Sequence, residues 1–453
     1  MSSMITTDKT TIVFGLGLTG LSVVRHLSKR GGQFIVVDSR DNPPGLEELE
    51  TRYKGIRVYC NADKNLVQNL LNSAHEIVLS PGVPRSLPEI KQAIKLGVSV
   101  VGDIALFLRE ATAPVVGITG SNGKTTVTTI VGEVAKKAGI NVAVAGNIGV
   151  PALDVLGKDC ELYVLELSSF QLESIPKAGL KVACMLNVSE DHMDRYESLA
   201  AYCMAKQRIY YGAQSVVYNL DDKLTQPPIL GNVIRYGFGL VEHKEASETK
   251  YLFSAEDRAL SIEDKKIVSA DELRMVGQHN IANALAVMAI CDAVDIDRAV
   301  TIKVLSHFAG LAHRCEWIAE KGGVTFINDS KATNVGAAMA AIEGLAGSFR
   351  SMVLIAGGDG KGAEFSTLGD LISEKVDTVI LLGQDAYKIS QTITPRPKVV
   401  FVENMAEAVA EAFKYSVSGG VVLLSPACAS FDMFNSFEER GLVFSAAVEA
   451  LVA

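Results

Sequence analysis

A repeating pattern of apolar and polar positions runs along most of the chain. Each repeat has a short run of β-branched residues, a turn rich in Gly, Asn or Ser, and a segment whose apolar residues have helical spacing. This alternation predicts an α/β fold, in which helices pack on the faces of parallel sheets. The strand-and-turn units lie at 11–17, 34–40, 76–82, 115–126, 141–147, 162–169, 181–189, 351–362, 377–385 and 420–430. Ligands bind such sheets beyond the carboxyl ends of the strands, where these polar turns fall.

The pattern is interrupted near 103–114 and again near 306–316, and 453 residues suffice for about three domains. Residues 232–270 contain short alternating segments, which predict antiparallel strands within the middle domain. We therefore expect three domains, at 1–105, 106–310 and 311–453.

The composition is that of a folded globular chain, with 48% hydrophobic and 21% charged residues, which excludes a disordered chain. The net charge of −9 makes nucleic acid an unexpected partner. The seven cysteines never form a C-x-x-C pair, so we expect free thiols in a reducing compartment and no zinc site. Because we find neither an export signal nor an apolar run of the ~20 residues that cross a bilayer, we expect a cytoplasmic protein without membrane contact.

The first glycine-rich turn, GLGLTG from Gly15 to Gly20, follows a predicted strand, and Asp38 ends the next strand. Taken alone, this is a dinucleotide fingerprint, in which glycines allow a tight turn and a helix N-terminus faces phosphate. It fits an NAD-dependent oxidoreductase. An unliganded turn also remains open, as does a site for another nucleotide diphosphate, because Arg40 offers a fork for a phosphate or a base edge.

The second turn, from Gly117 to Thr126 (GITGSNGKTT), is more specific. Its backbone N–H groups can cradle phosphates, Lys124 can reach the β- and γ-phosphates, and the Thr125 hydroxyl can bind Mg²⁺. It departs from the strict pattern because Ile118, not Gly, stands five positions before Gly123. The turn predicts that the protein uses ATP.

Acidic residues and a histidine follow two strands of the middle domain. Glu166 ends an apolar strand and could hold Mg²⁺, while Asn187, Asp191, His192 and Asp194 follow the next strand. Clustered near a phosphate loop, these side chains favour metal or phosphate contact over a structural histidine. The type and position of Lys206 indicate only a charged helix face.

Three more turns, at 328–334, 357–362 and 425–431, follow strands of the C-terminal domain. Thr333 and Lys361 could grip a small carboxylate, since a hydroxyl and a cation suit that group. The glycines of the turn at 357–362 are also explained by turn geometry alone.

Several strings together resemble the Mur ligases, in order along the chain: TGSNGKTT, AGNIG, LELSSFQLE, NVSEDHMDRY, NDSKATN, GGDGKG and SPACASFD. The resemblance runs from residue 12 to about 445. The Asp-Asn-Pro-Arg string of the member that adds a diamino acid is absent, so the chain is most similar to the member that adds D-glutamate. The resemblance implies a Rossmann-like UDP domain, a central P-loop-type ATPase domain with a parallel sheet plus a small antiparallel one, and a Rossmann-like C-terminal domain.

The resemblance also implies roles for individual residues. The uridine diphosphate substrate would contact Leu18, Thr19, Asp38, Ser39, Arg40, Gly82, Asn147 and His192. ATP would contact Gly120, Ser121, Asn122, Gly123, Lys124, Thr125, Thr126, Asn280, Asn283, Arg314 and Asp329. Two Mg²⁺ ions would be held by Thr125, Glu166, His192 and a carbamylated Lys206, and D-glutamate by Thr333, Lys361, Ser430 and Phe437. Lys124, His192 and Lys206 would serve catalysis.

The implied activity is ATP-dependent addition of D-glutamate to UDP-N-acetylmuramoyl-L-alanine through an acyl phosphate, by a monomer, in cytoplasmic peptidoglycan precursor synthesis. Another amino-acid specificity within the family, a folylpolyglutamate-type ligase, a nucleotide-binding switch and the oxidoreductase remain as alternatives. The oxidoreductase leaves the second glycine-rich turn and Glu166 without a role.

Overall fold

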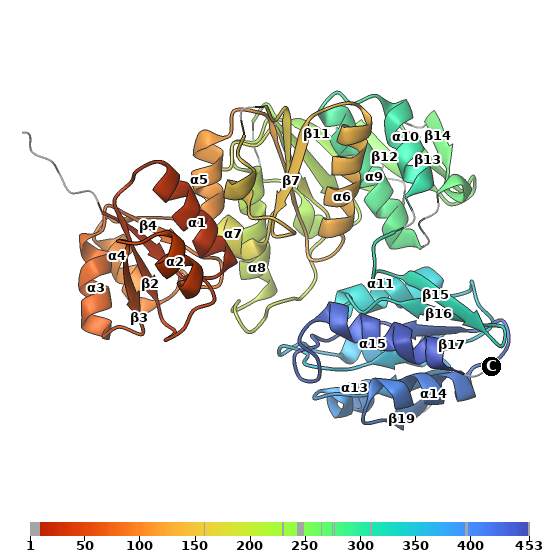
Figure 1. Cartoon of the computed structure of the whole chain (residues 1–453). Helices are drawn as coiled ribbons and strands as arrows, with labels where there is room; N and C mark the ends of the chain where they lie inside the picture. Colours follow the sequence, from red (N-terminus) through yellow and green to blue (C-terminus); the bar gives the residue numbers. More distant parts are fainter. Residues whose placement is uncertain are drawn as a thin grey trace, which may run out of the picture.

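The chain folds around three separate β-sheets, which follow one another along the sequence (Figure 1). The computed structural model describes residues 10–451 except 158, 229–230, 242–248, 264, 274, 276, 309 and 395–396. In this part of the chain no helix combines the length and apolar character needed to span a bilayer.

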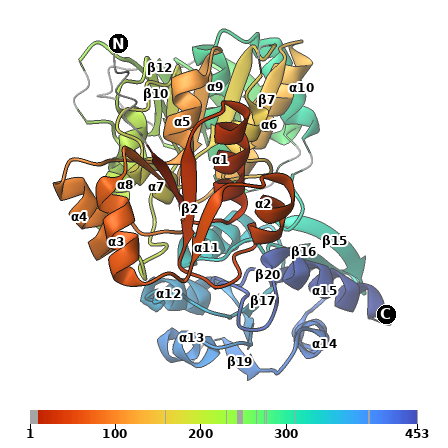
Figure 2. The same cartoon turned by 60° about the vertical axis from the view of Figure 1, so that its left-hand side comes forward.

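The N-terminal sheet has five parallel strands in the order β3-β2-β1-β4-β5. Its strands are β1 Thr11–Phe14, β2 Phe34–Asp38, β3 Arg57–Cys60, β4 Glu76–Leu79 and β5 Ser99–Val101. Its helices are α1 Leu18–Lys29, α2 Leu46–Arg52, α3 Lys64–Ser73, α4 Pro88–Lys95 and α5 Asp103–Glu110. Helices α1, α2 and α5 pack on one face and α3 and α4 on the other, as Figure 2 shows for α1 to α4.

The central sheet has nine strands in the order β14-β13-β12-β11-β10-β9-β6-β8-β7. They are β6 Val115–Thr119, β7 Val142–Gly146, β8 Leu162–Glu166, β9 Val182–Met185, β10 Ser215–Asn219, β11 Ile234–Gly239, β12 Thr249–Ser254, β13 Ala259–Ile262 and β14 Lys265–Ser269. The helices are α6 Lys124–Lys137, α7 Ser169–Glu173, α8 Leu199–Gln207, α9 Gln278–Ala293 and α10 Arg298–His307. Short 3₁₀ turns lie at Ala152–Val155 (η1), Arg208–Tyr210 (η2), Lys223–Thr225 (η3) and Ala270–Glu272 (η4).

The strands predicted for 232–270 are present, with a difference in how they pair. Strand β11 pairs in parallel with both β10 and β12, and only β12, β13 and β14 pair antiparallel. The antiparallel strands therefore extend the parallel sheet and do not form a separate one. A two-hairpin ribbon on its own would be marginal in water, and continuity with a large sheet stabilises it.

The C-terminal sheet has six strands in the order β15-β16-β20-β17-β18-β19, and all pairs are parallel except β15 with β16. The strands are β15 Glu316–Lys321, β16 Val324–Asn328, β17 Met352–Ala356, β18 Thr378–Leu381, β19 Lys398–Phe401 and β20 Val421–Leu424. The helices are α11 Val335–Leu345, α12 Ser366–Lys375, α13 Ala386–Thr392, α14 Met405–Tyr415 and α15 Phe437–Ala450. Helices α11, α12 and α13 cover one face, and α14 and α15 cover the other.

The N-terminal and central domains share a hydrophobic cluster, and the C-terminal domain has clusters of its own. One apolar cluster runs from the N-terminal helices into the central sheet, through α5, where the Phe107 ring meets Tyr163 edge-on at 4.9 Å between centroids. The C-terminal sheet has its own two clusters, one on each face. The expected boundary at 105/106 falls inside α5, and the one at 310/311 falls between α10 and β15; the domain limits stay a prediction.

Candidate functional site

The carboxyl ends of the N-terminal strands surround a cavity of about 420 Å³. It is lined by all six N-terminal residues expected to hold the uridine diphosphate, Leu18, Thr19, Asp38, Ser39, Arg40 and Gly82. The glycine-rich turn needs its glycines here: a Cβ on Gly20 would lie 1.9 Å from the Gly15 carbonyl oxygen. This close approach lets α1 begin directly after β1 and aim its N-terminus at the cavity.

The carboxylate of Asp38 is fully engaged by its own chain. Its Oδ2 accepts hydrogen bonds from the Leu16 amide at 2.7 Å and from Arg40 Nη2 at 2.8 Å, and its Oδ1 accepts from Arg40 N and Nε, both at 2.9 Å. Burial acts to raise the pKa of Asp38, but the hydrogen bonds from Arg40 and Leu16 outweigh it and lower the pKa. Asp38 therefore shapes the turn and positions Arg40, and its four hydrogen bonds leave its oxygens engaged and not open to the adenosine ribose that the corresponding acidic residue binds in NAD-dependent folds.

The phosphate loop joins β6 to α6 in the central domain. Gly120 and Gly123 have φ of +157° and +80°, and a Cβ on Gly123 would lie 2.5 Å from Asn283 Oδ1. Lys124 Nζ donates to the carbonyl oxygens of Gly120 and Ser121, both at 2.8 Å, so the loop wraps around the ammonium group. Burial lowers the pKa of Lys124, and Glu166 opposes this effect.

The segment after β9 clamps this loop. The Asn187 side chain accepts from Asn122 N at 2.8 Å and donates to Asn122 O at 3.1 Å, while Ser121 N donates to Asn187 O at 2.9 Å. Ser121 Oγ and the backbone of Ser189 exchange two hydrogen bonds of 2.9 Å. These contacts hold the backbone N–H groups of the loop in place before a phosphate arrives, which is a preorganised anion site.

Glu166 ends β8 beside the phosphate loop. Its Oε1 accepts from Asn147 Nδ2 at 2.9 Å, whereas its buried Oε2 has no hydrogen-bond partner among the described residues. A buried carboxylate oxygen without a partner costs free energy unless a cation or donor arrives with the ligand. Glu166 and Asn147 line the same cavity as Lys124 and Thr125.

Lys206 is buried, with 1% of its surface exposed, and does not lie on a charged helix face. It reaches from α8 to Gly120 O at 2.8 Å, so it shares this carbonyl oxygen with Lys124, and its Nζ lies 4.5 Å from the centre of the Tyr202 ring. Burial, together with the positive charge of Lys124, lowers the pKa of Lys206 well below that of a free lysine. Both effects shift the equilibrium of Lys206 toward the neutral amine, which is the nucleophilic form of a lysine, relative to a free lysine.

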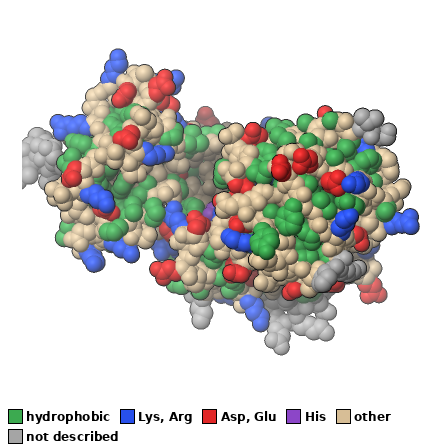
Figure 3. All heavy atoms as spheres, turned by 90° about the horizontal axis from the view of Figure 1, so that it is seen from below, with side chains coloured by type: hydrophobic (Ala, Val, Ile, Leu, Met, Phe, Trp, Pro, Cys, Tyr) green, Lys and Arg blue, Asp and Glu red, His purple; other side chains and the backbone are tan. Residues whose placement is uncertain are grey.

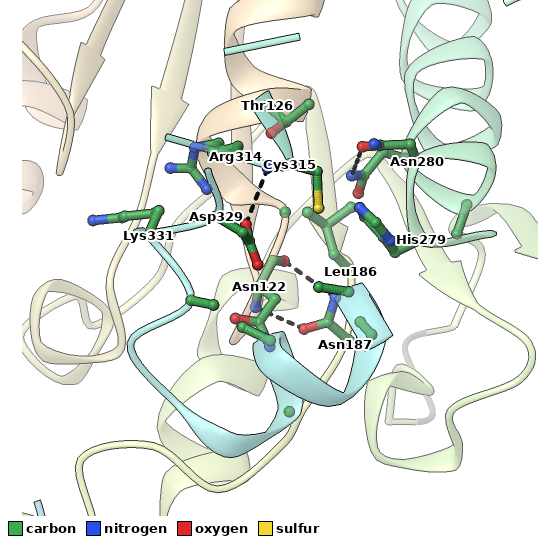
Figure 4. Close-up of a pocket in the computed structure, with 18 of the residues that line it drawn as sticks. Asn122, Thr126, Leu186, Asn187, His279, Asn280, Arg314, Cys315, Asp329 and Lys331 are labelled. Carbon is green, nitrogen blue, oxygen red and sulfur yellow. Dashed lines mark hydrogen bonds between the residues drawn. The ribbon is translucent and has the colours of Figure 1, made fainter. Parts of the chain in front are cut away.

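A second cavity, of about 310 Å³, lies between the central and C-terminal domains (Figure 4). Asn280, Asn283, Arg314 and Asp329 all line it, as the sequence predicted, together with Thr126 and Asn122. Figure 4 shows Arg314 and Lys331 on one side and His279 and Asn280 on the other. Burial raises the pKa of Asp329 to about 7, although Ser425 Oγ donates to it at 2.8 Å and Cys315 N at 3.1 Å.

A third cavity, of about 880 Å³ and larger than the two described above, joins the phosphate loop to the C-terminal domain. Figure 3 shows, from below, the hollowed face between the N-terminal lobe and the rest of the molecule, where acidic and basic side chains gather. Predicted residues from all four assigned sets (UDP substrate, ATP, Mg²⁺ and D-glutamate) line the cavity: Ser121, Asn122, Gly123, Lys124, Thr125, Asn147, Glu166, His192, Arg314, Thr333, Lys361, Ser430 and Phe437. The structure thus places the predicted phosphate, metal and amino-acid residues around one space. Gly120, within the loop, and Lys206, which donates to the Gly120 carbonyl oxygen, do not line this cavity.

Lys361 and Asn122 are held by hydrogen bonds between the central and C-terminal domains. Lys361 Nζ donates to Asp191 Oδ1 at 2.8 Å, and Asp191 Oδ2 accepts from Asn334 Nδ2 at 3.3 Å. Asn334, at the N-cap of α11, also exchanges hydrogen bonds with the Asn122 side chain at 3.2 and 3.4 Å. Burial acts to raise the pKa of Asp191, but Lys361 and His192 bring it below its usual value.

Sequence reasoning gave no role to Lys331 and Asn334, and it named Asn187 only as one of the polar residues after a strand near the phosphate loop. Lys331 lines both interdomain cavities and lies 3.8 Å from the centre of the Phe437 ring; burial lowers its pKa to about 8. Asn187 and Asn334 lock the phosphate loop, as described above. The strings NVSEDHMDRY and NDSKATN contain all three residues, but their partners lie far away in the sequence and only the fold brings them together.

Three family models match consecutive stretches of the chain. They are described as Mur ligase MurD-like, N-terminal domain, over residues 9–102; Mur ligase middle domain, over 118–291; and Mur ligase, glutamate ligase domain, over 313–428.

Curated relatives match the whole length. The chain is 54% identical to the UDP-N-acetylmuramoylalanine–D-glutamate ligase of Teredinibacter turnerae, with 100% of both chains covered. It is 48% identical to the ligase of the same name from Pseudomonas aeruginosa, with 99% of this chain and 100% of the relative covered.

Solved structures share the fold at lower identity. A pseudomurein peptide ligase type C from Methanothermus fervidus has a TM-score of 0.60 and 22% identity, and covers 92% of this chain and 97% of its own. The MurF ligase of Thermotoga maritima in complex with ADP has a TM-score of 0.58 and 17% identity, and covers 97% and 95%. Matches to all three parts of the chain, in order and over its full length, show that the protein belongs to the Mur ligase family.

Proposed function

We propose that the protein is an ATP-dependent ligase that joins D-glutamate to UDP-N-acetylmuramoyl-L-alanine in peptidoglycan precursor synthesis. The observation that carries this function is the 880 Å³ cavity, which brings a phosphate loop and a set of C-terminal cation and hydroxyl groups to one space. The names of relatives about half identical over the full length support the choice of substrates.

The acid substrate would span two cavities. Its uridine diphosphate would bind the N-terminal cavity beside Arg40, and its alanyl end would reach Asn147 and His192 in the large cavity. The two domains touch between these sites, where Arg195 Nη1 donates to Pro81 O at 3.0 Å. ATP would place its base and ribose in the 310 Å³ cavity and its phosphates on the loop at Lys124.

The chemistry follows from the inertness of a carboxylate, because an amine cannot expel oxide from it. Transfer of the γ-phosphoryl group of ATP to a carboxylate oxygen gives an acyl phosphate and ADP. The amine of D-glutamate then attacks the carbonyl carbon, loses a proton, and expels phosphate with the bridging oxygen, so that an amide forms. Lys124, placed by the loop, offsets negative charge on the phosphoryl group during its transfer.

The residues present fit Mg²⁺. The described residues contain no cluster of three or more His, Cys, Asp or Glu side chains, which suits an ion bound by one or two protein oxygens and by substrate phosphates. We assign Thr125, Glu166, with its unpartnered oxygen, and His192 as its protein contacts. Bound Mg²⁺ supplies charge neutralisation to the phosphates. We assign a second ion to the same cavity.

We also assign a carbamate to Lys206. The neutral amine that burial favours can attack the carbon of CO₂ and lose a proton, which gives an N-carboxylate. A protonated Lys206 would be repelled by Lys124, with which it shares Gly120 O, whereas the carbamate places an anion beside the Lys124 ammonium group. The resulting carboxylate could support a metal ion beside the phosphates.

D-glutamate would bind on the C-terminal side of the large cavity. Thr333, Lys361, Ser430 and Phe437 line this side, and the buried Ser430 Oγ has no partner among the described residues. A glutamate carboxylate could replace Asp191 at the Lys361 ammonium group. The amine would then face the alanyl carbon between the two domains. We further propose a monomer, located in the cytoplasm, with the three domains divided near 105 and 310.

An amino-acid panel tests this proposal. Purified protein with ATP, Mg²⁺ and UDP-N-acetylmuramoyl-L-alanine should release phosphate with D-glutamate, and should not with L-glutamate, D-aspartate or a diamino acid. Lys124→Ala should lose phosphate release on the order of 10³-fold while it still binds the UDP substrate in calorimetry. Phosphate release without any amino acid would favour a nucleotide switch, and a change in nicotinamide absorbance would favour an oxidoreductase.

A further inference from the structure

Arg440, on the second turn of α15, is a buried arginine with no role in the chemistry described above. It is 3% exposed, and no carboxylate among the described residues forms an ion pair with it. Burial lowers its pKa to about 10. A guanidinium group is seldom buried without a carboxylate partner, because its desolvation is costly unless all its donors are used.

Four hydrogen bonds from the guanidinium group of Arg440 go to the C-terminal turns. Nε donates to Ser330 Oγ at 3.0 Å and Nη2 to Ser330 O at 2.7 Å. Nη1 donates to Cys428 O at 3.0 Å and to Ala429 O at 3.3 Å. One guanidinium group therefore ties the turn that carries Thr333 to the turn that carries Ser430.

The remaining two residues of the proposed D-glutamate site are linked to the same group. Ser330 Oγ, which accepts from Arg440, donates to Phe437 O at 2.8 Å. Ala429 O, also an Arg440 acceptor, accepts from Asp359 N at 3.1 Å, and Asp359 Oδ1 accepts from Lys361 N at 2.9 Å. All four segments that carry Thr333, Lys361, Ser430 and Phe437 thus meet at or one step from Arg440.

The turns around Arg440 pack closely against one another at Gly358. Gly358, in the turn before Lys361, has φ of +128°, and a Cβ there would lie 2.3 Å from Ala429 O and 3.4 Å from Arg440 Nη1. The turns approach one another this closely only because Gly358 has no side chain. The planar fork of the guanidinium then spans three carbonyl oxygens and one hydroxyl that a lysine ammonium could not reach together.

We infer that Arg440 is the positioning residue of the acceptor amino-acid site, holding Thr333, Lys361, Ser430 and Phe437 in one geometry. The inference rests on the proposed function and deepens it, because it names what sets the affinity for D-glutamate. Arg440 itself does not line the 880 Å³ cavity. It acts through the backbone of the turns and not by contact with substrate.

The test compares Michaelis constants for the three substrates. Arg440→Lys should raise KM for D-glutamate by about tenfold or more, since hydrogen bonds from a charged group are lost. KM for ATP and for the UDP substrate should stay within about twofold of wild type. Trapping of the acyl phosphate with hydroxylamine, which needs no amino acid, should proceed at the wild-type rate.

Two further variants separate positioning from general stability. Ser330→Ala removes one Arg440 acceptor and the Phe437 contact with little change in volume, so it should raise KM for D-glutamate in the same direction by a smaller factor. Val448→Ala, on the same helix and fully buried, should lower Tm without changing KM for D-glutamate. If Arg440→Lys does not fold, the KM of Ser330→Ala for D-glutamate tests the inference on its own.

An unchanged KM for D-glutamate in Arg440→Lys and Ser330→Ala would overturn the inference. So would equal rises in all three KM values in these variants and in Val448→Ala, because that pattern reports loss of domain stability. A wild-type protein that does not use D-glutamate would instead contradict the proposed function, and this result is seen before any variant is made.

Discussion

Several polar side chains of the site are held in states that cost free energy without a ligand. Glu166 Oε2 and Ser430 Oγ are buried and lack partners among the described residues, and Lys124 and Lys206 donate to the same carbonyl oxygen. Each unpartnered buried polar atom costs about 1–3 kcal/mol. All four residues gather at or below one cavity, as expected for groups whose partners arrive with the substrates.

Lys206→Ala tests the carbamate. Ligation should fall on the order of 10²-fold or more, because the variant cannot form the carbamate that we propose to support the phosphate site. Added acetate or formate should restore part of the rate, while the same concentration of chloride should not. An active wild-type protein whose Lys206 carries no carbamate, judged by ¹³C NMR after equilibration with labelled CO₂, would contradict the assignment.

Asp329→Asn tests the buried carboxyl of the nucleotide cavity. Because its pKa is raised to about 7, the folded protein retains a proton between its usual pKa and pH 7 that the unfolded chain has lost, so stability falls as pH rises through this window. The neutral variant should therefore gain Tm relative to wild type between pH 5 and 8, by about 3 °C or more.

The same variant should lose nucleotide affinity, because a ribose acceptor is removed. We expect KM for ATP to rise about tenfold at pH 8. Thermal melts and ATP titrations over the same pH series measure both effects. A Tm difference that does not change with pH would show that Asp329 is not the titrating group.

The chemistry of single residues was predictable where it depends on residue type at a turn, and not where it depends on burial. Lys124 and Glu166 follow strands in recognisable strings, and both line the expected cavity. Nothing in the sequence around Lys206 predicts its burial. The apolar residues near it on helix α8 do not show which other segment of the chain packs against the helix. The Asp191–Lys361 pair spans 170 positions and depends on how two domains meet.

At the scale of elements, the conformation of the phosphate loop is fixed by its glycines and by hydrogen bonds from the segment after β9. Its two glycines adopt positive φ, and the Asn187 side chain holds it from the far side. The helix that follows begins at Lys124, so its first N–H groups point at the phosphate position. The loop is therefore ready before ATP binds.

Gly123→Ala tests this element. A Cβ there is strained at φ +80° and would lie 2.5 Å from Asn283 Oδ1, so we expect a stability loss of about 1–3 kcal/mol and a marked rise in KM for ATP. Gly139→Ala is the matched control, because Gly139 has φ of +83° with nothing within 4 Å of its Cβ position. It should cost some stability and leave KM for ATP unchanged. Equal KM values in the two variants would argue against the contact with Asn283.

Most strands with a strong apolar run were predicted, and several edge strands were not. All ten predicted strand-and-turn units contain a strand of the structure, whereas β3 and β19 lie at sheet edges and are partly exposed along their length. An edge strand needs no continuous apolar run, so its sequence resembles a loop. Strand β11 was expected to pair antiparallel, because a single sequence does not show which neighbour a short strand takes.

In the whole molecule, the C-terminal domain is the part with an independent core. The N-terminal and central domains share one apolar cluster, while the C-terminal sheet packs only against its own helices. Its contacts with the central domain at the site are polar, through Asp191, Asn334 and Lys361. This arrangement suits a domain that moves to admit and release substrates.

Phe107→Ala tests the shared core. Removal of this buried ring should cost about 3–5 kcal/mol and should destabilise the N-terminal and central domains together. Phe444→Ala, at an equally buried site in the C-terminal domain, is the control. In scanning calorimetry the two variants should each shift a different transition. A shift of the same transition in both would show that the three domains unfold as one unit.

The central claim is that a carboxylate becomes an acyl phosphate before the amine attacks. UDP-N-acetylmuramoyl-L-alanine carrying ¹⁸O in both oxygens of its alanyl carboxylate tests it directly, together with ATP and D-glutamate. The account predicts that each phosphate released carries one ¹⁸O atom and that the amide product retains the other. Formation of the amide with unlabelled phosphate would contradict the account.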